Sequence, residues 1–295
     1  MENCILYNPN ANNGKCKEVA EQFAANLKGG ENKLCDITKI GTYKDFFAGL
    51  DAETAVIICG GDGTLNRFVN ETAGLNYANK IYYYPMGSGN DFWRDVEYTD
   101  GEPLEMAKYL TDLPEVTVKG KTYKFLNNVG FGIDGYCCEV GDKLKETSDK
   151  PINYTGIAIK GLLFHYKKTN ATVIVDGVKH EYKNVWLAPT MNGRYYGGGM
   201  MPTPDQNRLG DGTLSVMVYH CWGKLKALMA FPSIFKGEHV KKTGMVEVLT
   251  GREITVKFDG PRAVQIDGET ILGVTEYSAK AVKNAAIDLA AATEA

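Results

Sequence analysis

Short apolar runs alternate with segments of helical spacing along the first ~120 residues. The apolar runs predict strands over 4–9 (CILYNP), 54–59 (TAVIIC) and 80–87 (KIYYYPMG). Apolar residues spaced near 3.6 positions predict helices over 16–28, 42–50, 64–75 and 102–111. Strands separated by single helices indicate βαβ units. We therefore expect an N-terminal α/β domain with a mainly parallel sheet.

The pattern changes after about residue 115. Alternating residues with turn signals predict strands over 115–130, 170–190, 211–220 and 251–271. This part of the chain predicts an antiparallel sandwich or barrel, interrupted by helices near 151–168 and 223–237. The segment 276–292 fits a strand or a helix. We expect domains at 1–120 and 121–277, with 278–295 packing back on the first domain, and an active site in the cleft between them.

Composition narrows the class of protein. The 295 residues are 44% hydrophobic and 23% charged, as in ordinary globular proteins, and the net charge of -3 gives no attraction to nucleic acid. Seven scattered cysteines without a C-x-x-C pair favour reduced thiols. The N-terminus lacks a signal peptide pattern, and no apolar run reaches the ~18 residues of a membrane span. We expect a cytoplasmic protein that contacts a membrane only locally.

The first candidate site is GGDGT, residues 60–64, between a buried strand and a helix. Glycines let backbone N–H groups approach a phosphate, and the helix N-terminus adds partial positive charge. Asp62 would repel a phosphate, so it suits Mg²⁺ or a hydroxyl better. The alternative is a tight turn in which the aspartate begins the helix.

Two further loops follow strands in the same way. Residues 86–92 (MGSGNDF) carry Ser88, Asn90 and Asp91, and residues 8–15 read NPNANNGK. The latter is not a Walker A loop, because the first glycine is missing and Cys16 follows Lys15. Two glycine loops that each carry an acid favour a nucleotide triphosphate site over two unrelated turns.

These three loops, with 192–216 (NGRYYGGGMMPTPDQNRLGDGTLSV) and 264–269 (VQIDGE), resemble the motifs of the diacylglycerol kinase catalytic-domain family. That family includes bacterial lipid kinases and sphingosine kinases. The resemblance implies a two-domain kinase that uses ATP and Mg²⁺. The implied nucleotide-binding residues are Asn8, Pro9, Asn10, Ala11, Asn12, Thr38, Gly60, Gly61, Asp62, Gly63, Thr64, Leu65, Asn66 and Ser88.

The resemblance also implies a structural Mg²⁺ in RLGDGT, held by the Asp211 carboxylate and the backbone oxygens of Arg208 and Thr213. Oxygen ligands from a short loop suit this hard cation. Taken alone, the segment also fits an Asp-Gly hairpin turn.

The predicted catalytic residues are carboxylates. Asp267 and Glu269 bracket a glycine, and repulsion between converging carboxylates would raise one pKa towards a basic role; an ordinary hairpin is the alternative. The family assigns the base to this motif, and we choose Asp267 with Glu269 as partner. Asp62 and Asp91 would hold the catalytic Mg²⁺ or relay charge. Thr117 stands where family members often carry an acid.

The expected function is ATP- and Mg²⁺-dependent phosphorylation of a lipid hydroxyl, with diacylglycerol as the default acceptor. The lysine-rich segment 142–168 predicts either a peripheral, transient membrane contact or a packed helix. The alternatives are an NAD kinase-like phosphotransferase and a nucleotide-binding regulator without turnover. We expect no nucleic acid partner; a homodimer stays open.

Overall fold

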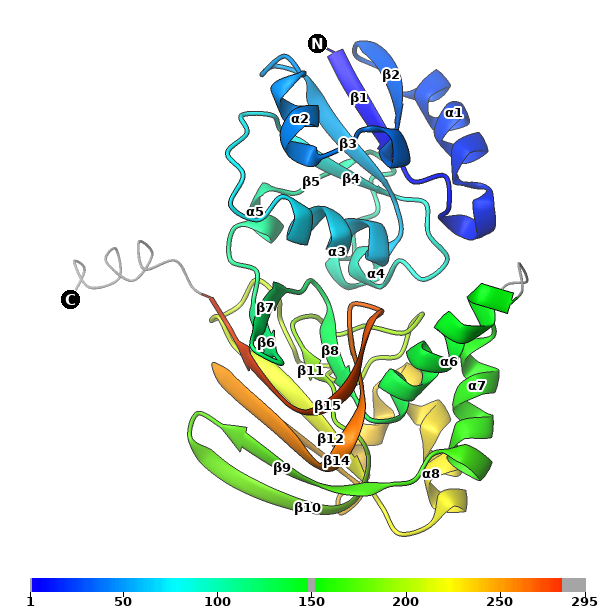
Figure 1. Cartoon of the computed structure of the whole chain (residues 1–295), viewed down its shortest axis with the longest axis vertical. Coiled ribbons are helices and arrows are strands. Elements are labelled where there is room, and N and C mark those ends of the chain that lie inside the picture. The colour runs from blue at the N-terminus through cyan, green and yellow to red at the C-terminus, as the bar shows by residue number, and fades with distance from the viewer. Residues whose placement is uncertain (1, 148–151, 283–295) are drawn as a thin grey trace, which may run out of the picture. The chain divides into compact units, whose positions relative to one another are not determined.

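The computed structural model describes residues 2–147 and 152–282. The chain divides into two compact units between Thr111 and Asp112 (Figure 1). This division comes earlier than residue 120, because the strand Glu115–Val118 pairs with a strand near the end of the second unit.

The first unit is built on a five-stranded sheet in the order β2-β1-β3-β4-β5. The first four of these strands are parallel, and β5 is antiparallel to β4. Every residue of β3 is buried, as expected for a central strand covered on both faces. The strands are β1 (Glu2–Tyr7), β2 (Glu31–Asp36), β3 (Ala55–Gly60), β4 (Ile81–Pro85) and β5 (Leu104–Glu105).

Helices cover this sheet. One cluster packs the α1 residues Cys16 and Ala20 against Ile5 and Ile57, and on α2 and α3 the aromatic rings of Tyr43, Phe47 and Phe68 contact one another. The helices are α1 (Cys16–Asn26), α2 (Tyr43–Ala48), α3 (Asp62–Glu71), α4 (Asp91–Val96) and α5 (Ala107–Leu110), with short turns η1 (Asn12–Gly14) and η2 (Ile37–Lys39).

One predicted helix of this unit is shorter than expected. The sequence predicted a helix over 102–111, but the structure is helical only from Ala107. Leu104 and Glu105 instead pair with Tyr83 and Tyr82 at the sheet edge. Pairing with an available strand outweighs the weak helical pattern here.

The second unit contains a ten-stranded sheet whose strand pairs are all antiparallel among the described residues. Its order is β7-β6-β15-β14-β8-β11-β12-β10-β9, with β13 paired to β12. The strands are β6 (Glu115–Val118), β7 (Lys121–Lys124), β8 (Asn128–Phe131), β9 (Thr169–Val175), β10 (Val178–Leu187), β11 (Thr190–Met191), β12 (Leu214–His220), β13 (Val246–Gly251), β14 (Glu253–Ile266) and β15 (Glu269–Lys280).

The long strand β14 closes this sheet on itself. Its first half, Ile254 to Phe258, pairs with β9, while Val264 to Ile266 pair with β8. The register shifts between these halves, so the strand bends around the core. Inside, the rings of Phe131 and Phe258 stack with centroids 3.9 Å apart.

Helices and helical turns accompany this sheet: α6 (Ile133–Thr147), α7 (Tyr154–Lys160), the π-helical turn η3 (Gly161–His165), α8 (Lys224–Ala230), η4 (Phe231–Lys236) and η5 (Glu238–Lys241). Those near 151–168 and 223–237 were predicted. Within the described ranges, no helix has the length and apolar character needed to cross a membrane.

Helix α6 was not predicted, because two glycines interrupt its pattern and lower its helix propensity. Close packing explains both glycines. A Cβ at Gly135 would lie 2.0 Å from the carbonyl oxygen of Ala263, and one at Gly141 would lie 2.7 Å from the Tyr154 ring. At the C-terminus, β15 continues to Lys280. The sequence predicted that residues 278–295 pack back on the first domain. Of this segment, residues 283–295 lie outside the described residues.

Candidate functional site

The predicted nucleotide-binding residues of the first unit gather at one edge of its sheet. The loop beginning at Asn8 follows β1, Thr38 follows β2, Asp62 follows β3 and Ser88 follows β4. These four strands are parallel, so their carboxyl ends meet at the same edge. Their order places β1 and β3 side by side while the chain leaves them in opposite directions. Such a switch point is where open α/β sheets bind ligands.

The two glycine loops touch through their backbones. A Cβ at Gly87 would lie 2.3 Å from the Cα of Gly61 and 2.9 Å from Asn90 Oδ1. The Met86 N–H donates to the Gly60 carbonyl at 2.7 Å, and the Tyr83 hydroxyl donates to the same carbonyl at 3.1 Å. The loops therefore form a single structure, and only glycine fits where they cross.

Asp62 joins the two loops. Its carboxylate accepts the Asp91 N–H at 2.9 Å and the Phe92 N–H at 2.8 Å, so it caps the N-terminus of α4 from the neighbouring loop. Asn90 has a left-handed backbone and makes no side-chain cap of its own helix. Instead, its side chain fixes the loop by accepting from Gly87 N–H at 3.0 Å and donating to Gly87 O at 2.8 Å. Metal binding by Asp62 stays a prediction.

Asp91 is buried at the start of α4, with Arg94 Nη1 3.9 Å from its Oδ1. Burial also differs among the predicted nucleotide-binding residues of α3. Thr64, Leu65 and Asn66 are each at most 5% exposed, so the Leu65 side chain belongs to the core rather than to a ligand surface. At Gly63, by contrast, an added Cβ would meet nothing within 4 Å. This residue leaves open space at the first turn of α3.

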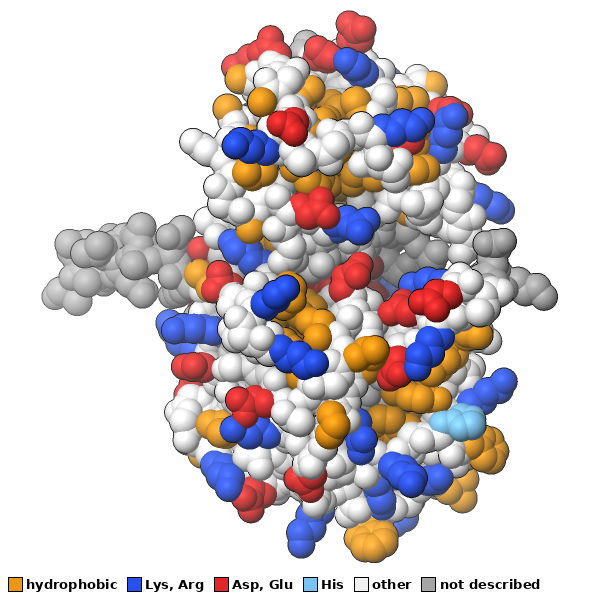
Figure 2. All heavy atoms as spheres, in the orientation of Figure 1, with side chains coloured by type: hydrophobic (Ala, Val, Ile, Leu, Met, Phe, Trp, Pro, Cys, Tyr) orange, Lys and Arg blue, Asp and Glu red, His pale blue; other side chains and the backbone are white. Residues whose placement is uncertain are grey.

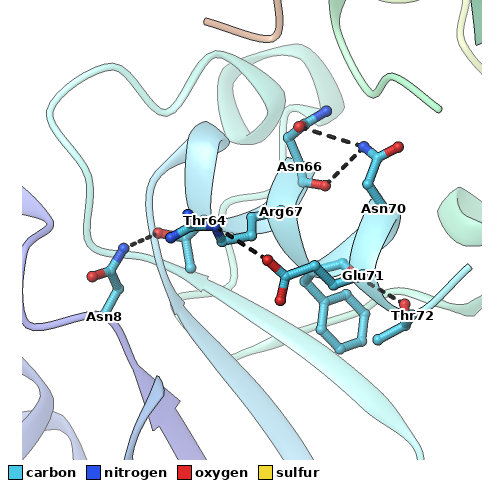
Figure 3. Close-up of polar contacts among 8 residues, drawn as sticks. Asn8, Thr64, Asn66, Arg67, Asn70, Glu71 and Thr72 are labelled. Carbon is cyan, nitrogen blue, oxygen red and sulfur yellow. Dashed lines mark hydrogen bonds and ion pairs between the residues drawn. The ribbon is translucent and has the colours of Figure 1, made fainter. Parts of the chain in front are cut away.

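The loop after β1 is fastened to α3 (Figure 3). Asn8 Nδ2 donates to Thr64 Oγ1 at 2.8 Å, while Asn8 Oδ1 accepts the Asn10 N–H at 3.0 Å. Elsewhere on α3, Arg67 pairs with Glu71, and Asn70 Nδ2 donates to the Asn66 carbonyl at 3.1 Å. The loop then continues through Asn12, Asn13 and Gly14, all with positive φ. Short asparagine side chains tolerate that conformation.

Ser88 and Thr38 lie at the surface of the same edge. The Thr38 hydroxyl donates to Asp36 Oδ1 at 2.7 Å. The structure thus brings three of the predicted pieces into direct contact and leaves Thr38 at the end of the edge strand β2.

The predicted catalytic residues belong to the second unit. Asp267 and Gly268 have positive φ and connect β14 to β15 as a two-residue turn, the hairpin weighed as the alternative. The buried Asp267 carboxylate accepts three backbone N–H groups, those of Leu126, Asn127 and Asn128, at 2.5, 2.8 and 2.9 Å. The turn is therefore more than a hairpin, because it holds the segment that leads into β8. Glu269 is exposed.

The predicted metal loop is built from oxygen-rich residues. Asp211 is exposed, and with Asp205 and Thr213 it lines a hollow of about 570 Å³. The Thr213 carbonyl accepts Gln206 Nε2 at 2.9 Å, and the Arg208 side chain donates to Leu126 O at 3.2 Å and Asn127 Oδ1 at 3.0 Å. Arg208 thereby links this loop to the residues held by Asp267.

The donor chemistry of this loop fits Mg²⁺, because carboxylate and carbonyl oxygens are its preferred ligands. In residues 2–147 and 152–282, no three or more His, Cys, Asp or Glu side chains are grouped to hold a metal ion. A site here would therefore depend on backbone oxygens and water.

Sequence reasoning missed Asp134, at the start of α6. Burial raises the pKa of its carboxyl to about 6, although the Gly135 N–H and the Gln265 side chain lower it. The N–H of Gly268 in turn donates to Gln265 Oε1 at 2.7 Å, so the acid adjoins the Asp267 turn. The signal was an aspartate beside glycine after an apolar strand (GFGIDG), the pattern that identified Asp62.

Thr117, where an acid was expected, lies on β6 with its hydroxyl 3.1 Å from that of Thr122 in β7. Where an acid was expected, the β6–β7 hairpin therefore has a pair of neutral hydroxyl groups.

Comparison with known proteins identifies two family domains along the chain. Residues 2–119 match the diacylglycerol kinase catalytic domain, and residues 127–289 match the YegS C-terminal NAD kinase beta sandwich-like domain. The chain is 27% identical to a diacylglycerol kinase of Mycobacterium tuberculosis over 280 residues, covering 90% of this chain and 87% of that protein. It is 26% identical to the Bacillus subtilis protein named "Putative lipid kinase YtlR", covering 75% of each.

The fold is also that of solved relatives. A crystal structure of a diacylglycerol kinase from Bacillus anthracis aligns with a TM-score of 0.58 at 19% identity, covering 97% of this chain and 98% of that one. Both domains of the family are present in the expected order. The chain therefore belongs to the diacylglycerol kinase catalytic-domain family of lipid kinases.

Proposed function

We propose that this protein transfers the γ-phosphate of ATP to the hydroxyl of a membrane lipid, with diacylglycerol as the acceptor, in a reaction that depends on Mg²⁺. The observation that carries the proposal is the backbone contact between Gly61 and Gly87, beside the switch point that β1 and β3 form. It holds the second glycine loop against the N-terminus of α3, where backbone N–H groups favour an anion.

The nucleotide half of the reaction belongs to the first unit. The loops after β1, β3 and β4 would surround the phosphates, with Gly63 leaving room at the α3 N-terminus. Backbone N–H groups and the N-terminus of α3 favour negative charge, while Asp62 already occupies the N-terminus of α4. Asp62 would act chiefly by fixing α4 against the first glycine loop.

The acceptor half belongs to the second unit. Asp267 would take the proton from the lipid hydroxyl. In the same step the lipid oxygen would attack the γ-phosphorus, and the bond between that phosphorus and the β-phosphate oxygen would break, which releases ADP. Three backbone donors fix the orientation of this carboxylate. The exposed Glu269 is the second candidate for the base.

Bound Mg²⁺ would supply neutralisation of phosphate charge. Asp62 and Asp91 are the candidates at the nucleotide, and the Asp211 carboxylate with the backbone oxygens of Arg208 and Thr213 would hold a structural ion. We also propose a cytoplasmic enzyme that reaches its substrate by transient contact with the membrane surface.

The test is transfer of label from γ-labelled ATP to diacylglycerol in mixed micelles, with and without Mg²⁺. The same assay is carried out with the variants Asp267→Asn and Glu269→Gln, and with NAD in place of the lipid acceptor. We expect labelled phosphatidic acid, its loss without Mg²⁺, and at least about 100-fold lower turnover in Asp267→Asn.

Label in NADP would assign the chain to NAD phosphorylation instead. ATP binding without label in any lipid of a bacterial extract would favour a nucleotide-binding regulator. Equal turnover of Asp267→Asn and wild type would remove Asp267 as the base and direct attention to Glu269.

A further inference from the structure

The second unit exposes four large apolar side chains on two segments that are far apart in the sequence. Phe164 in η3 is 73% exposed, and Trp222, just before α8, is 82% exposed. Leu225 and Met229 of α8 are each 66% exposed. The opposite side of the same helices is packed, since Ala158, Leu162 and Ala227 are buried together in one cluster. The exposed apolar residues are therefore additional to the face that these helices bury in the core.

Lysines fasten the two segments to each other. Lys224 Nζ donates to the Leu163 carbonyl at 2.8 Å, which joins α8 to η3. Lys168 donates to the Trp222 carbonyl, and its ammonium lies 4.5 Å from the centre of the Trp222 ring. Phe164 and Trp222 are thus presented by one connected structure. We call this surface, made of segments 152–168 and 221–237, the apolar-basic face.

Charge distinguishes this face from the rest of the chain. Its two segments contain six lysines and neither aspartate nor glutamate, whereas the whole chain has a net charge of -3. The six are Lys160, Lys167, Lys168, Lys224, Lys226 and Lys236. On the adjoining α6, Glu139 pairs with Lys143 and Asp142 with Lys145, so neighbouring acids are matched by their own lysines.

The space-filling view shows hydrophobic side chains and lysines interspersed over the region of α7 and α8 (Figure 2). A hollow of about 450 Å³ borders the face, lined in part by His165, Lys167 and Arg262 together with Glu139. Aromatic and aliphatic side chains surrounded by lysines are the composition of surfaces that insert shallowly into anionic bilayers.

We propose that the apolar-basic face docks on the surface of an anionic phospholipid bilayer, with Phe164, Trp222, Leu225 and Met229 entering the headgroup layer. This deepens the proposed lipid kinase function and rests on it for the identity of the acceptor. Docking itself does not require turnover. A protein partner or a second copy of the chain would not explain the absence of acids across both segments as directly as a surface of phosphates does.

The first test is binding to vesicles without ATP. Phosphatidylglycerol–phosphatidylcholine vesicles are compared with pure phosphatidylcholine vesicles by sedimentation and by tryptophan emission. We expect binding to the anionic vesicles with a blue shift from Trp222, and weakening as salt is added. Removing both rings in Phe164→Ala/Trp222→Ala should weaken binding by about 100-fold, roughly tenfold for each ring.

The second pair of substitutions, Lys160→Gln/Lys226→Gln, tests the charge; the side chains of these two lysines form no hydrogen bond or ion pair with any residue that the structure describes. We expect about 30-fold weaker binding at low salt. The matched controls are Val178→Ala, 59% exposed on β10, and Lys183→Gln, exposed on the same strand, which should bind like wild type.

Activity separates this proposal from the proposed function. With long-chain diacylglycerol in anionic vesicles, the ring variant should lose turnover in proportion to binding, while dissolved short-chain diacylglycerol should be phosphorylated at the wild-type rate. Vesicle binding that depends on the face, with no kinase activity on any lipid, would refute only the proposed function. Wild-type vesicle binding by both variants, or a change in oligomeric state in place of vesicle binding, would overturn the docking proposal.

Discussion

Two carboxylates at the candidate site hold segments of backbone in place. Asp62 accepts two N–H groups of α4, and Asp267 accepts three from residues 126–128. Asp62 thereby replaces a missing local partner, since α4 has no side-chain cap from Asn90. A carboxylate held by several backbone donors is both fixed in orientation and costly to remove. Substitution of either therefore reports on local structure as well as on activity.

Asp134 gives a prediction about pH at the residue scale. Burial raises the pKa of its carboxyl from an ordinary value of 3.8 to about 6 in the folded chain. The folded state thus binds the proton more tightly than the unfolded chain, so this group stabilises the fold at low pH and loses that contribution as pH rises from about 4 to above 6.

Asp134→Asn removes the ionisation. We expect the variant to gain stability relative to wild type as pH rises from 4 to 7, on the order of 3 kcal/mol at pH 8. Urea unfolding of both proteins at pH 4.5 and pH 8 measures the difference. A difference that is constant with pH would show that burial does not perturb this carboxyl.

At the scale of elements, the proposed nucleotide site depends on two loops that cross where both have glycine. The crossing lies between Gly61 and Gly87, directly beyond the ends of β3 and β4. The Tyr83 hydroxyl, whose pKa burial raises well above the usual range, supports the crossing through the Gly60 carbonyl. Loop and strand positions are therefore coupled, and a methyl group at the crossing must displace one backbone from the other.

Gly87→Ala should be destabilising for this reason. We expect a loss of about 1–3 kcal/mol in the free energy of unfolding and at least tenfold weaker ATP binding. The matched control is Gly63→Ala, because Gly63 is within α3 and its added Cβ would meet nothing within 4 Å. There a gain of about 0.5–1 kcal/mol is expected. Chemical denaturation measures the free energy of unfolding, and calorimetric titration measures the affinity for ATP. Equal stability of the two variants would contradict a close backbone crossing at Gly87.

At the scale of the whole molecule, the two halves of the proposed reaction belong to different units. The loops proposed to bind the phosphates lie within residues 1–111, while the Asp267 turn, the Asp211 loop and the apolar-basic face lie in the second unit. Binding of ATP and chemistry on the acceptor are therefore expected to respond separately to substitution.

Asp267→Asn tests this separation. Its ATP affinity should stay within about twofold of wild type while turnover falls, since the glycine loops and the Asp267 turn belong to different units. Gly87→Ala should show the reverse order, with ATP binding lost first. Fluorescence titration with a nucleotide analogue, alongside the labelled transfer assay, gives both quantities. Parallel loss of ATP binding in the two variants would show that the units do not act separately.

Much of the fold follows from local sequence. Short apolar runs predicted β1, β3 and β4, and 3.6-residue spacing predicted the helices α1 to α3. The glycine loops were recognisable because they follow buried strands. Patterns failed where tertiary contacts decide. Leu104 and Glu105 became a strand because β4 offered an edge, and α6 formed because Gly135 and Gly141 allow close packing.

The sequence by itself determined the alternation of elements, the family and the loops that carry the candidate chemistry, because spacing and turn residues act locally. Only the tertiary structure decided which groups meet: Asp62 on the α4 amides, Asp267 on residues 126–128, and Phe164 beside α8. A side chain's role depends on partners that are distant in the chain, as Asp267 is from Asn127. No local pattern contains that information.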